Sequence, residues 1–171
     1  MATMKQLWWV DWDQIELREV EIPQVKPNEV KVKVAYAALC ATDVHQVTMG
    51  VMNSKPPAPL GHEASGTIVE LGEQAAAAGY KVGDKVTMFP VSHCGECEWC
   101  KKGMTQYCIN SKPTGAFAEY VVTDVKTIYK LPDNVELRDY AIVEPTNCCL
   151  RAMDLAPIRH GATVCVAGAG G

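Results

Sequence analysis

The sequence predicts a mainly β fold with short helices, and three observations support this class. Short segments of alternating apolar and polar residues recur between frequent glycine and proline turns, which is typical of a barrel or a sandwich. Four cysteines lie within fifteen residues, which indicates a metal-binding lobe among the strands. An apolar run near the end of the chain leads into a glycine cluster, which indicates the start of a parallel-sheet unit.

Period-2 alternation places most of the strands. The clearest example is Glu29–Val34, which reads E-V-K-V-K-V and so has one wet face and one packed face. We expect strands over Lys5–Val10, Ile15–Ile22, Glu29–Val34, Ala64–Leu71, Lys85–Phe89, Ala118–Thr123 and Thr127–Leu131.

Three segments are expected to be helical. Thr42–Met49 begins at Thr42, a residue suited to an N-cap, and Asn134–Tyr140 follows Asp133 or Asn134 as its cap. The third helix is expected over Pro145–Leu155. Ala75–Ala78 is expected to be a loop or a helical turn.

Length, charge and cysteine content exclude several classes of protein. A chain of 171 residues is long enough for one domain with its core, or for one domain and the beginning of another. A net charge of −4 gives no reason to expect nucleic acid or an anionic membrane as a partner. We find no signal-peptide pattern and no apolar run long enough to cross a bilayer. Eight cysteines without a secretion signal therefore predict a cytoplasmic protein.

Cys94, Cys97, Cys100 and Cys108 follow the spacing C-x2-C-x2-C-x7-C. Four thiolates this close in sequence suit one tetrahedral zinc with no open ligand position, so this metal would organise a loop. A disulfide framework is one alternative, although C-x2-C neighbours are poor structural staples. An iron–sulfur cluster is another, because ferredoxins share C-x2-C-x2-C. Their run ends in x3-C-P, however, whereas here Ile109 follows the last cysteine.

A second group of metal-binding residue types surrounds Cys40 and His62. A catalytic zinc takes about three protein ligands and keeps one exchangeable position. Cysteine and histidine suit zinc, and a carboxylate from Glu63 or Glu144 could complete the set. Each of these residues also has an ordinary structural explanation, as a small buried residue, a core histidine or a solvated charge.

The glycines near the end of the chain follow a predicted buried strand, Thr163–Ala167. A strand followed by G-x-G-x-x-G opens the dinucleotide-binding βαβ unit, in which the glycines let the backbone approach the pyrophosphate. Gly168 and Gly170 would be the first two glycines of that motif. Only its first four positions are present, and a flexible glycine tail is the alternative.

Several motifs in order give the chain a resemblance to a known family. The sequence resembles the zinc-dependent medium-chain alcohol dehydrogenases, and the resemblance covers nearly the whole chain. The matching motifs are Gly61-His62-Glu63-x-x-Gly66, Gly83-Asp84-Lys85-Val86, the four-cysteine lobe, Gly115-Ala116-Phe117-Ala118-Glu119-Tyr120, and Glu144-Pro145. The last pair is similar to the E-P of the polyol and threonine dehydrogenase branches.

The resemblance implies a GroES-like, partly open β-barrel as a catalytic domain over residues 1–150, with a structural zinc lobe at residues 93–109. It implies that residues 151–171 are a linker helix followed by the first strand and glycine turn of a truncated Rossmann domain. It also implies an enzyme that passes a hydride from a small alcohol or polyol to NAD or NADP. Two zinc ions per chain and a homo-oligomer complete this expectation.

The resemblance also assigns roles around the catalytic zinc. Cys40 and His62 are ligands, Glu144 stands where the family places its third protein ligand, and Glu63 alternates with that position in the polyol branch. The sequence does not decide between the two glutamates. Asp43 is expected to accept a hydrogen bond from the other nitrogen of His62.

A proton relay and an inactive fragment are further expectations. Thr42 would accept the proton of the alcohol, and His45 would pass it on. The 171-residue chain alone is expected to be inactive because it lacks a complete nucleotide-binding domain, so a non-enzymatic zinc-binding module is an alternative. An iron–sulfur electron carrier is a third. Cys148, Cys149 and Cys165 match no ligand pattern and are expected to be small buried residues.

Overall fold

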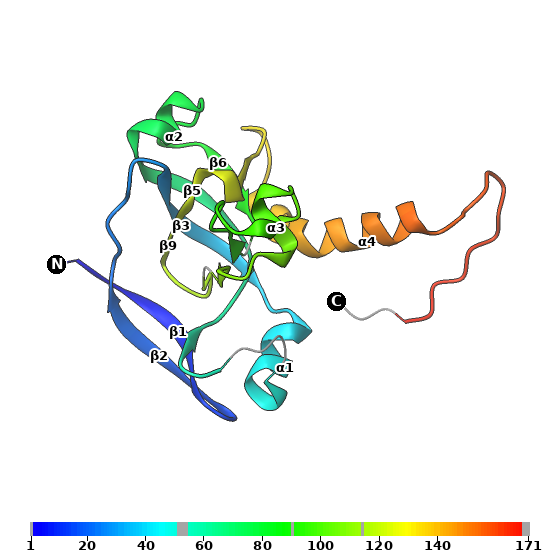
Figure 1. Ribbon diagram of the computed structural model, residues 1–171, viewed down its shortest axis with the longest axis horizontal. Helices are drawn as coiled ribbons and strands as arrows, with labels where there is room; N and C mark the ends of the chain where they lie inside the picture. Colours follow the sequence, from blue (N-terminus) through cyan, green and yellow to red (C-terminus); the bar gives the residue numbers. More distant parts are fainter. Residues whose placement is uncertain (1, 51–54, 90, 114, 169–171) are drawn as a thin grey trace.

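The computed structural model describes residues 2–50, 55–89, 91–113 and 115–168, which form three antiparallel sheets and several short helices (Figure 1). The first sheet has the order β2 (Gln14–Glu21), β1 (Thr3–Asp11), β4 (Ala58–Pro59). The second has the order β10 (Ile128–Lys130), β6 (Lys85–Met88), β5 (Glu63–Leu71), β3 (Glu29–Ala38), β9 (Tyr120–Asp124). The third pairs β7 (Val91–Ser92) with β8 (Lys112–Pro113).

The helices lie at the margins of these sheets. The α-helices are α1 (Ala41–Met49), α2 (Glu73–Ala77), α3 (Glu98–Lys101) and α4 (Val143–Leu155). The 3-10 helices are η2 (Thr105–Tyr107), η3 (Val125–Thr127) and η4 (Leu137–Tyr140). Within the part of the chain that the structure describes, no helix is long and apolar enough to cross a membrane.

The core lies on one face of the five-stranded sheet, as the alternating pattern of β3 predicts. Val30 and Val32 are fully buried, while Lys33 between Val32 and Val34 is exposed. They pack in one cluster with residues from the neighbouring strands β5, β6, β9 and β10. The buried members from those strands are Ala64, Ile68, Val86, Met88, Val121 and Ile128.

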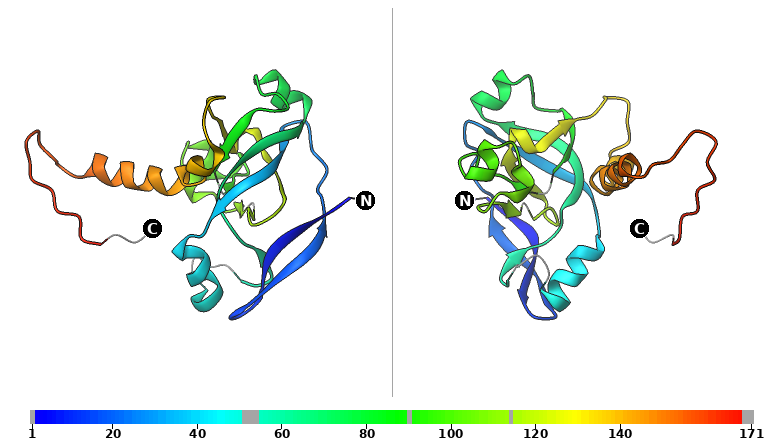
Figure 2. Two further views of the ribbon diagram at one scale, coloured as in Figure 1. Left: turned by 180° about the vertical axis from the view of Figure 1, so that it is seen from behind. Right: turned by 45° about the vertical axis from the view of Figure 1, so that its right-hand side comes forward.

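Backbone hydrogen bonds join the first two sheets into a curled, partly open barrel. The N–H of Leu7 on β1 donates to the carbonyl of Phe117 at 2.8 Å, and Leu60 N–H donates to Leu7 O at 3.1 Å. An antiparallel bridge between Gln6 and Ala118 lies beside them. The expected partly open β-barrel is thus confirmed, with the β1–β2 hairpin forming one wall (Figures 1 and 2).

Two glycines of the G-H-E-x-x-G motif are required by the fold. Gly61 has φ of +91°, and a Cβ there would lie 2.6 Å from the backbone N of Phe117. A Cβ on Gly66 would lie 2.3 Å from the carbonyl oxygen of Lys33 on β3. The motif therefore keeps β5 close to β3 and to the loop before β9.

The C-terminal helix α4 extends away from the barrel and is followed by a chain segment without secondary structure (Figures 1 and 2). The helix has no buried residue, so the expected burial of Cys148 and Cys149 is wrong, and Cys165 is exposed as well. Thr163–Ala167 forms no strand, because a strand needs a hydrogen-bonded neighbouring strand and none of the described strands pairs with this segment. Its role as the first strand of a Rossmann domain stays a prediction.

Two helical expectations are also corrected. The N-cap of α1 is Cys40 rather than Thr42. The segment expected as a helix over Asn134–Tyr140 contains only the 3-10 helix η4, which begins after Glu136 and has no side-chain cap.

Candidate metal centres

The turn from β3 into α1 positions the first candidate ligand, Cys40. Its Sγ accepts a hydrogen bond from the N–H of Thr42 at 3.4 Å, and the Asp43 carboxylate accepts from the Cys40 N–H at 3.1 Å. Together these bonds form a capping box in which a cysteine takes the place usually held by serine or threonine. The thiol is thus fixed at the N-terminus of a helix, next to the positive end of the helix dipole.

Cys40, His62 and Glu63 form the first candidate metal centre. One ligand atom from each lies within 4.8 Å of the others. Glu63 is the first residue of β5 and His62 directly precedes it. The C-terminal end of β3 leads into Cys40, so the β3–β5 pairing brings the three together. A set of thiolate, imidazole and carboxylate is suited to zinc.

Asp43 fixes the orientation of His62. Its Oδ1 lies 3.2 Å from His62 Nδ1 and also accepts from the N–H of Gly61 at 3.2 Å. The hydrogen bond to Asp43 raises the pKa of His62 from 6.5 to about 9, and partial burial opposes this rise. With Nδ1–H donating to Asp43, Nε2 is the nitrogen available for a metal.

The two glutamates lie on different elements. Glu63 is buried with 4% of its surface exposed, and buried carboxylates in proteins are paired or coordinate metals. Glu144 lies in the first turn of α4 and is outside the 4.8 Å group. Burial raises the pKa of Glu144, Glu63 adds to this rise, and the charge of His62 opposes it. The charges of His62 and Glu63 therefore both act on the Glu144 carboxyl group.

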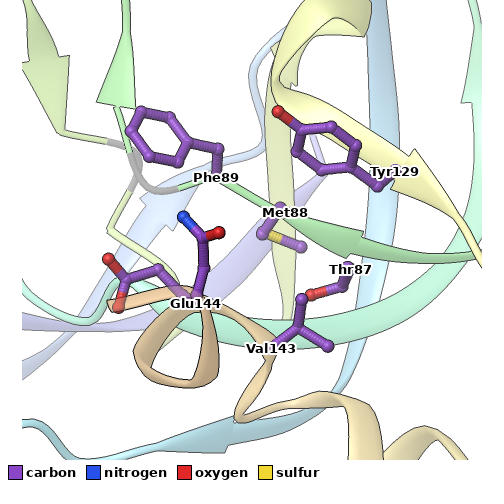
Figure 3. Close-up of a pocket in the computed structure, with 7 residues that line it drawn as sticks. Thr87, Met88, Phe89, Tyr129, Val143 and Glu144 are labelled. Carbon is purple, nitrogen blue, oxygen red and sulfur yellow. The ribbon is translucent and has the colours of Figure 1, made fainter. Parts of the chain in front are cut away.

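A pocket of about 260 Å³ adjoins Glu144 (Figure 3). Met88 and Phe89 line it from the end of β6, Tyr129 from β10, and Val143 from the start of α4. Sequence analysis did not predict these four lining residues, because none of them belongs to a recognisable motif.

Thr42 and His45, the predicted relay residues, lie on α1 next to Cys40. They are three residues apart, so they share one face of the helix. Thr42 is partly buried and His45 is exposed, which is the order expected of a path from a site to solvent.

The four cysteines of the lobe form the second candidate centre. Cys94, Cys97, Cys100 and Cys108 have sulfur atoms within 4.8 Å of one another, and Cys108 Sγ lies 3.6 Å from Cys94 Sγ. Zinc–sulfur bonds of about 2.3 Å in a tetrahedron place two sulfurs about 3.8 Å apart. All eight cysteines of the chain are free in the structure, so the disulfide alternative has no support in its geometry.

Backbone donors and tight turns support the lobe. The N–H of Cys94 donates to Cys108 Sγ at 3.3 Å, and Cys97 N–H donates to Cys94 Sγ at 3.4 Å. Gly95 and Gly103 have φ of +73° and +74°, which favours glycine at both turns.

The crowding of thiols affects their titration. Hydrogen bonds from the backbone N–H groups of Glu96 and Cys97 lower the pKa of Cys94 to about 6. Loss of water and the neighbouring thiol of Cys97 raise the pKa of Cys100 to about 12. Four thiolates in one place therefore need a cation, and zinc is the ion that this donor set fits.

The candidate nucleotide residues are only partly described. Gly168 is exposed and has φ of +106°, a conformation that favours glycine, while Gly170 lies outside the described residues.

Comparison with protein families places the chain. Residues 26–133 match the alcohol dehydrogenase GroES-like domain. The chain belongs to the zinc-dependent medium-chain alcohol dehydrogenase family. The predicted resemblance is thus confirmed, and the iron–sulfur carrier has no support among these relatives.

The curated relatives of this chain include proteins named as dehydrogenases of polyols and sugar alcohols. It is 35% identical over 148 residues to D-arabitol-phosphate dehydrogenase of Enterococcus avium, covering 83% of this chain and 42% of that protein. It is 37% identical over 158 residues to sorbitol dehydrogenase of Halalkalibacterium halodurans, covering 88% and 45%. The chain therefore spans less than half the length of these curated relatives.

Solved structures agree with the fold. A candidate zinc-binding dehydrogenase from Sinorhizobium meliloti 1021, solved with NADP bound, superposes with a TM-score of 0.84 at 34% identity. The match covers 95% of this chain and 48% of that chain. Zinc and NAD(P) are accordingly the cofactors associated with this family.

Proposed function

We propose that this chain supplies the catalytic domain of a zinc-dependent dehydrogenase that oxidises an alcohol or polyol, with NAD or NADP as hydride acceptor. The observation that carries the proposal is the convergence of Cys40, His62 and Glu63 within 4.8 Å beside the buried Asp43. The names of the relatives support a polyol or sugar alcohol as the substrate class.

Cys40, His62 and Glu63 would hold the catalytic zinc, and Glu144 would lie beside it. Of the two glutamates, Glu63 is the one whose carboxylate lies within reach of the other two ligands. When bound, zinc supplies Lewis-acid polarisation of the alcohol oxygen, which makes its proton easier to remove. Asp43 holds the His62 ring in the tautomer that leaves Nε2 free.

Thr42 and His45 carry the proton away in this proposal. As the Thr42 hydroxyl accepts the proton from the substrate hydroxyl it donates its own proton onward, and His45 delivers that proton from the exposed side of α1 to solvent.

The second zinc has a structural role. Cys94, Cys97, Cys100 and Cys108 would use all four ligand positions, so the lobe would bind metal without contacting substrate. We therefore propose two zinc ions per chain, and we propose a homo-oligomeric assembly.

The isolated 171-residue polypeptide is expected to behave differently from a complete dehydrogenase. Gly168 is exposed, and within residues 2–168 as described no parallel sheet surrounds it to receive a pyrophosphate. Tested by itself, this polypeptide would act as a zinc-binding module without turnover. Micromolar binding of NAD or NADP to it would contradict this proposal.

Metal content and cobalt spectroscopy test the proposed function together. We expect about two zinc ions per chain, about one in Cys97→Ser, about one in Cys40→Ser, and no change in Cys165→Ser, whose thiol is exposed. In cobalt-substituted Cys97→Ser, addition of sorbitol should change the visible spectrum, because only the accessible ion remains. A metal-free folded chain, or a spectrum insensitive to sorbitol, would refute the catalytic assignment.

A further inference from the structure

The outer edge of β2 is an unpartnered strand. β2 is the terminal strand of its sheet and pairs with β1, and with no other strand of the described chain. It contains eight residues and no proline. In Figure 1 it forms the outside of the blue hairpin at the lower left. An edge strand of this length presents a row of free backbone groups to a partner.

Hydrogen bonding across the hairpin shows which backbone groups are free. The N–H of Ile22, just after β2, donates to the carbonyl of Ala2, so the backbone groups of residue 22 point toward β1. Backbone groups alternate in direction along a strand, so those of Ile15, Leu17 and Glu19 point outward. The partner strand agrees, because Leu7, paired with Leu17, directs its own groups to the opposite side, toward Leu60 and Phe117.

The outward-facing residues include two exposed apolar side chains. Ile15 is 54% exposed and Leu17 is 64% exposed, although they lie opposite Trp9, which is fully buried, and Leu7. Apolar side chains of this size on a free edge favour association rather than protection of the edge.

The charges of β2 select a second copy of the same strand as the partner. In an antiparallel pair related by a two-fold axis at one residue, the residue a given number of positions after the axis faces the residue the same number of positions before it in the other copy. An axis at Leu17 places Glu16 of each copy opposite Arg18 of the other. An axis at Glu16, Arg18 or Glu19 instead places two like charges directly opposite each other. Only the Leu17 register among these neighbours matches opposite charges.

The same register agrees with the backbone pattern. Leu17 would form a hydrogen-bonded pair with its copy, and Ile15 would pair with Glu19 of the other copy, giving about six backbone hydrogen bonds. The Glu16–Arg18 pairs then fall at the non-hydrogen-bonded positions, where side chains are closest. Arg18 already lies 3.0 Å from Glu16 of its own strand and 5.6 Å from the Trp8 ring, so its guanidinium is held on this edge.

We propose that β2 is a homodimer interface, in which two copies pair antiparallel about Leu17 and join their three-stranded sheets into one continuous six-stranded sheet. The turn at Asp13, with φ of +54°, ends the ladder on one side. This inference gives the proposed homo-oligomer an interface, and it does not depend on the proposed catalytic chemistry, because no residue of either metal centre lies on β2.

Sedimentation equilibrium of the zinc-loaded full chain tests the interface. Wild type should show a reversible monomer–dimer equilibrium that weakens with salt. Arg18→Glu and Glu16→Arg should each lower the association constant by about tenfold or more, because each places like charges opposite each other twice. The double variant E16R/R18E should restore the wild-type constant, since it exchanges the two charges.

A backbone variant provides the second test. Leu17→Pro removes an N–H that points outward, so the chain should fold with an unchanged far-UV circular dichroism spectrum but remain monomeric. Leu17→Thr, which keeps the N–H, should retain part of the association. A wild type that stays monomeric, or an association indifferent to Leu17→Pro and to the charge reversals, would overturn the proposal.

Discussion

Asp43 holds three parts of the candidate catalytic site in one place. Its carboxylate accepts from the N–H of Cys40 at the start of α1, from the N–H of Gly61 before β5, and from Nδ1 of His62. With 3% of its surface exposed, it makes these bonds away from solvent, where each is stronger than in water. One side chain thus fixes both the thiol and the imidazole.

We expect Asp43→Asn to weaken zinc binding by about 10–100-fold, because it removes the charged partner that orients His62. In the metal-free protein, the Asp43 bond raises the pKa of His62 to about 9. That contribution to stability is fully present below pH 6.5 and is lost as the pH rises through about 9. The variant should lose this pH dependence and show a His62 pKa nearer 6.5 by NMR.

The control for Asp43→Asn is Asp154→Asn, the same change on the exposed helix α4. It should leave zinc affinity and the His62 titration unchanged. Equal zinc affinity in wild type and Asp43→Asn would contradict the positioning role of Asp43.

At the residue scale, sequence reasoning selected candidate ligands that the structure brings together, but it missed some local contacts. The contact of Asp43 with His62 was predicted and is confirmed. The N-cap role of Cys40 was not predicted, because a thiol is a weaker acceptor than the hydroxyls preferred at N-caps. Thr42 has such a hydroxyl and was therefore predicted as the N-cap. The exposure of Cys148 could not be read from a residue type that is usually buried.

At the element scale, the contact of β5 with β3 depends on Gly66. We expect Gly66→Ala to lower the free energy of unfolding by about 1–3 kcal/mol, because its Cβ would overlap the Lys33 carbonyl. Gly79→Ala is the matched control, since Gly79 has φ of +92° but open space around it, and it should cost about 1 kcal/mol. The free energy of unfolding in urea, measured for both variants, separates the cost of crowding at Gly66 from the cost of backbone strain at Gly79. A Gly66→Ala variant as stable as wild type would show that β3 can move away from the added Cβ without loss of stability.

The turn before β6 depends on a buried carboxylate. Asp84 is 1% exposed; its Oδ2 accepts from the Lys81 N–H at 3.0 Å and its Oδ1 lies 2.9 Å from Lys130 Nζ on β10. Burial alone would raise the pKa of Asp84, but the bonds from Lys130 and Lys81 outweigh it and lower the pKa below its usual value. The ionised carboxylate therefore links the turn to the edge strand of the sheet.

Because the folded-state pKa of Asp84 is lowered, its contribution to stability is present above the unfolded pKa and is lost as the pH falls through the folded one. We expect Asp84→Asn to cost about 1–3 kcal/mol at neutral pH, a range limited by the exposure of Lys130. Thermal unfolding measured from pH 7 to acid should show the difference between wild type and variant shrinking. A difference independent of pH would mean that the charge of Asp84 contributes nothing.

Alternation predicted the strands well because each has one buried face, and that pattern is local to the strand. The segment Asn134–Tyr140 failed because long-range contacts decide its conformation. Lys85 Nζ donates hydrogen bonds to the carbonyl oxygens of Asp133 and Val135 at 2.8 and 2.7 Å. Ser65 Oγ donates to the carbonyl oxygen of Leu137 at 2.5 Å. In an α-helix these carbonyl oxygens would accept from the N–H four residues later. The hydrogen bonds from Lys85 on β6 and Ser65 on β5 therefore override the local helix propensity of the segment.

At the scale of the whole molecule, the barrel and its motifs could be predicted because they are spaced in order along the sequence. The pairing that brings Cys40 to His62 was predictable only through the family resemblance, since 22 positions separate them and no local pattern links them. The exposure of α4 and of residues 161–168 depends on what packs against them, and no local pattern in the sequence contains that information.

Thiol reactivity measures how two zinc ions would partition the eight cysteines of the molecule. Cys148, Cys149 and Cys165 are exposed, whereas Cys40 and the four lobe cysteines belong to the candidate centres. We expect about three thiols of the zinc-loaded chain to react rapidly with a disulfide reagent, and all eight to react once a chelator removes the metal. Cys149→Ser should lower the rapid count by one and leave the chelator-released count unchanged. Eight thiols reacting at a single rate in zinc-loaded protein would contradict both metal centres, because zinc-bound thiolates are held away from the reagent.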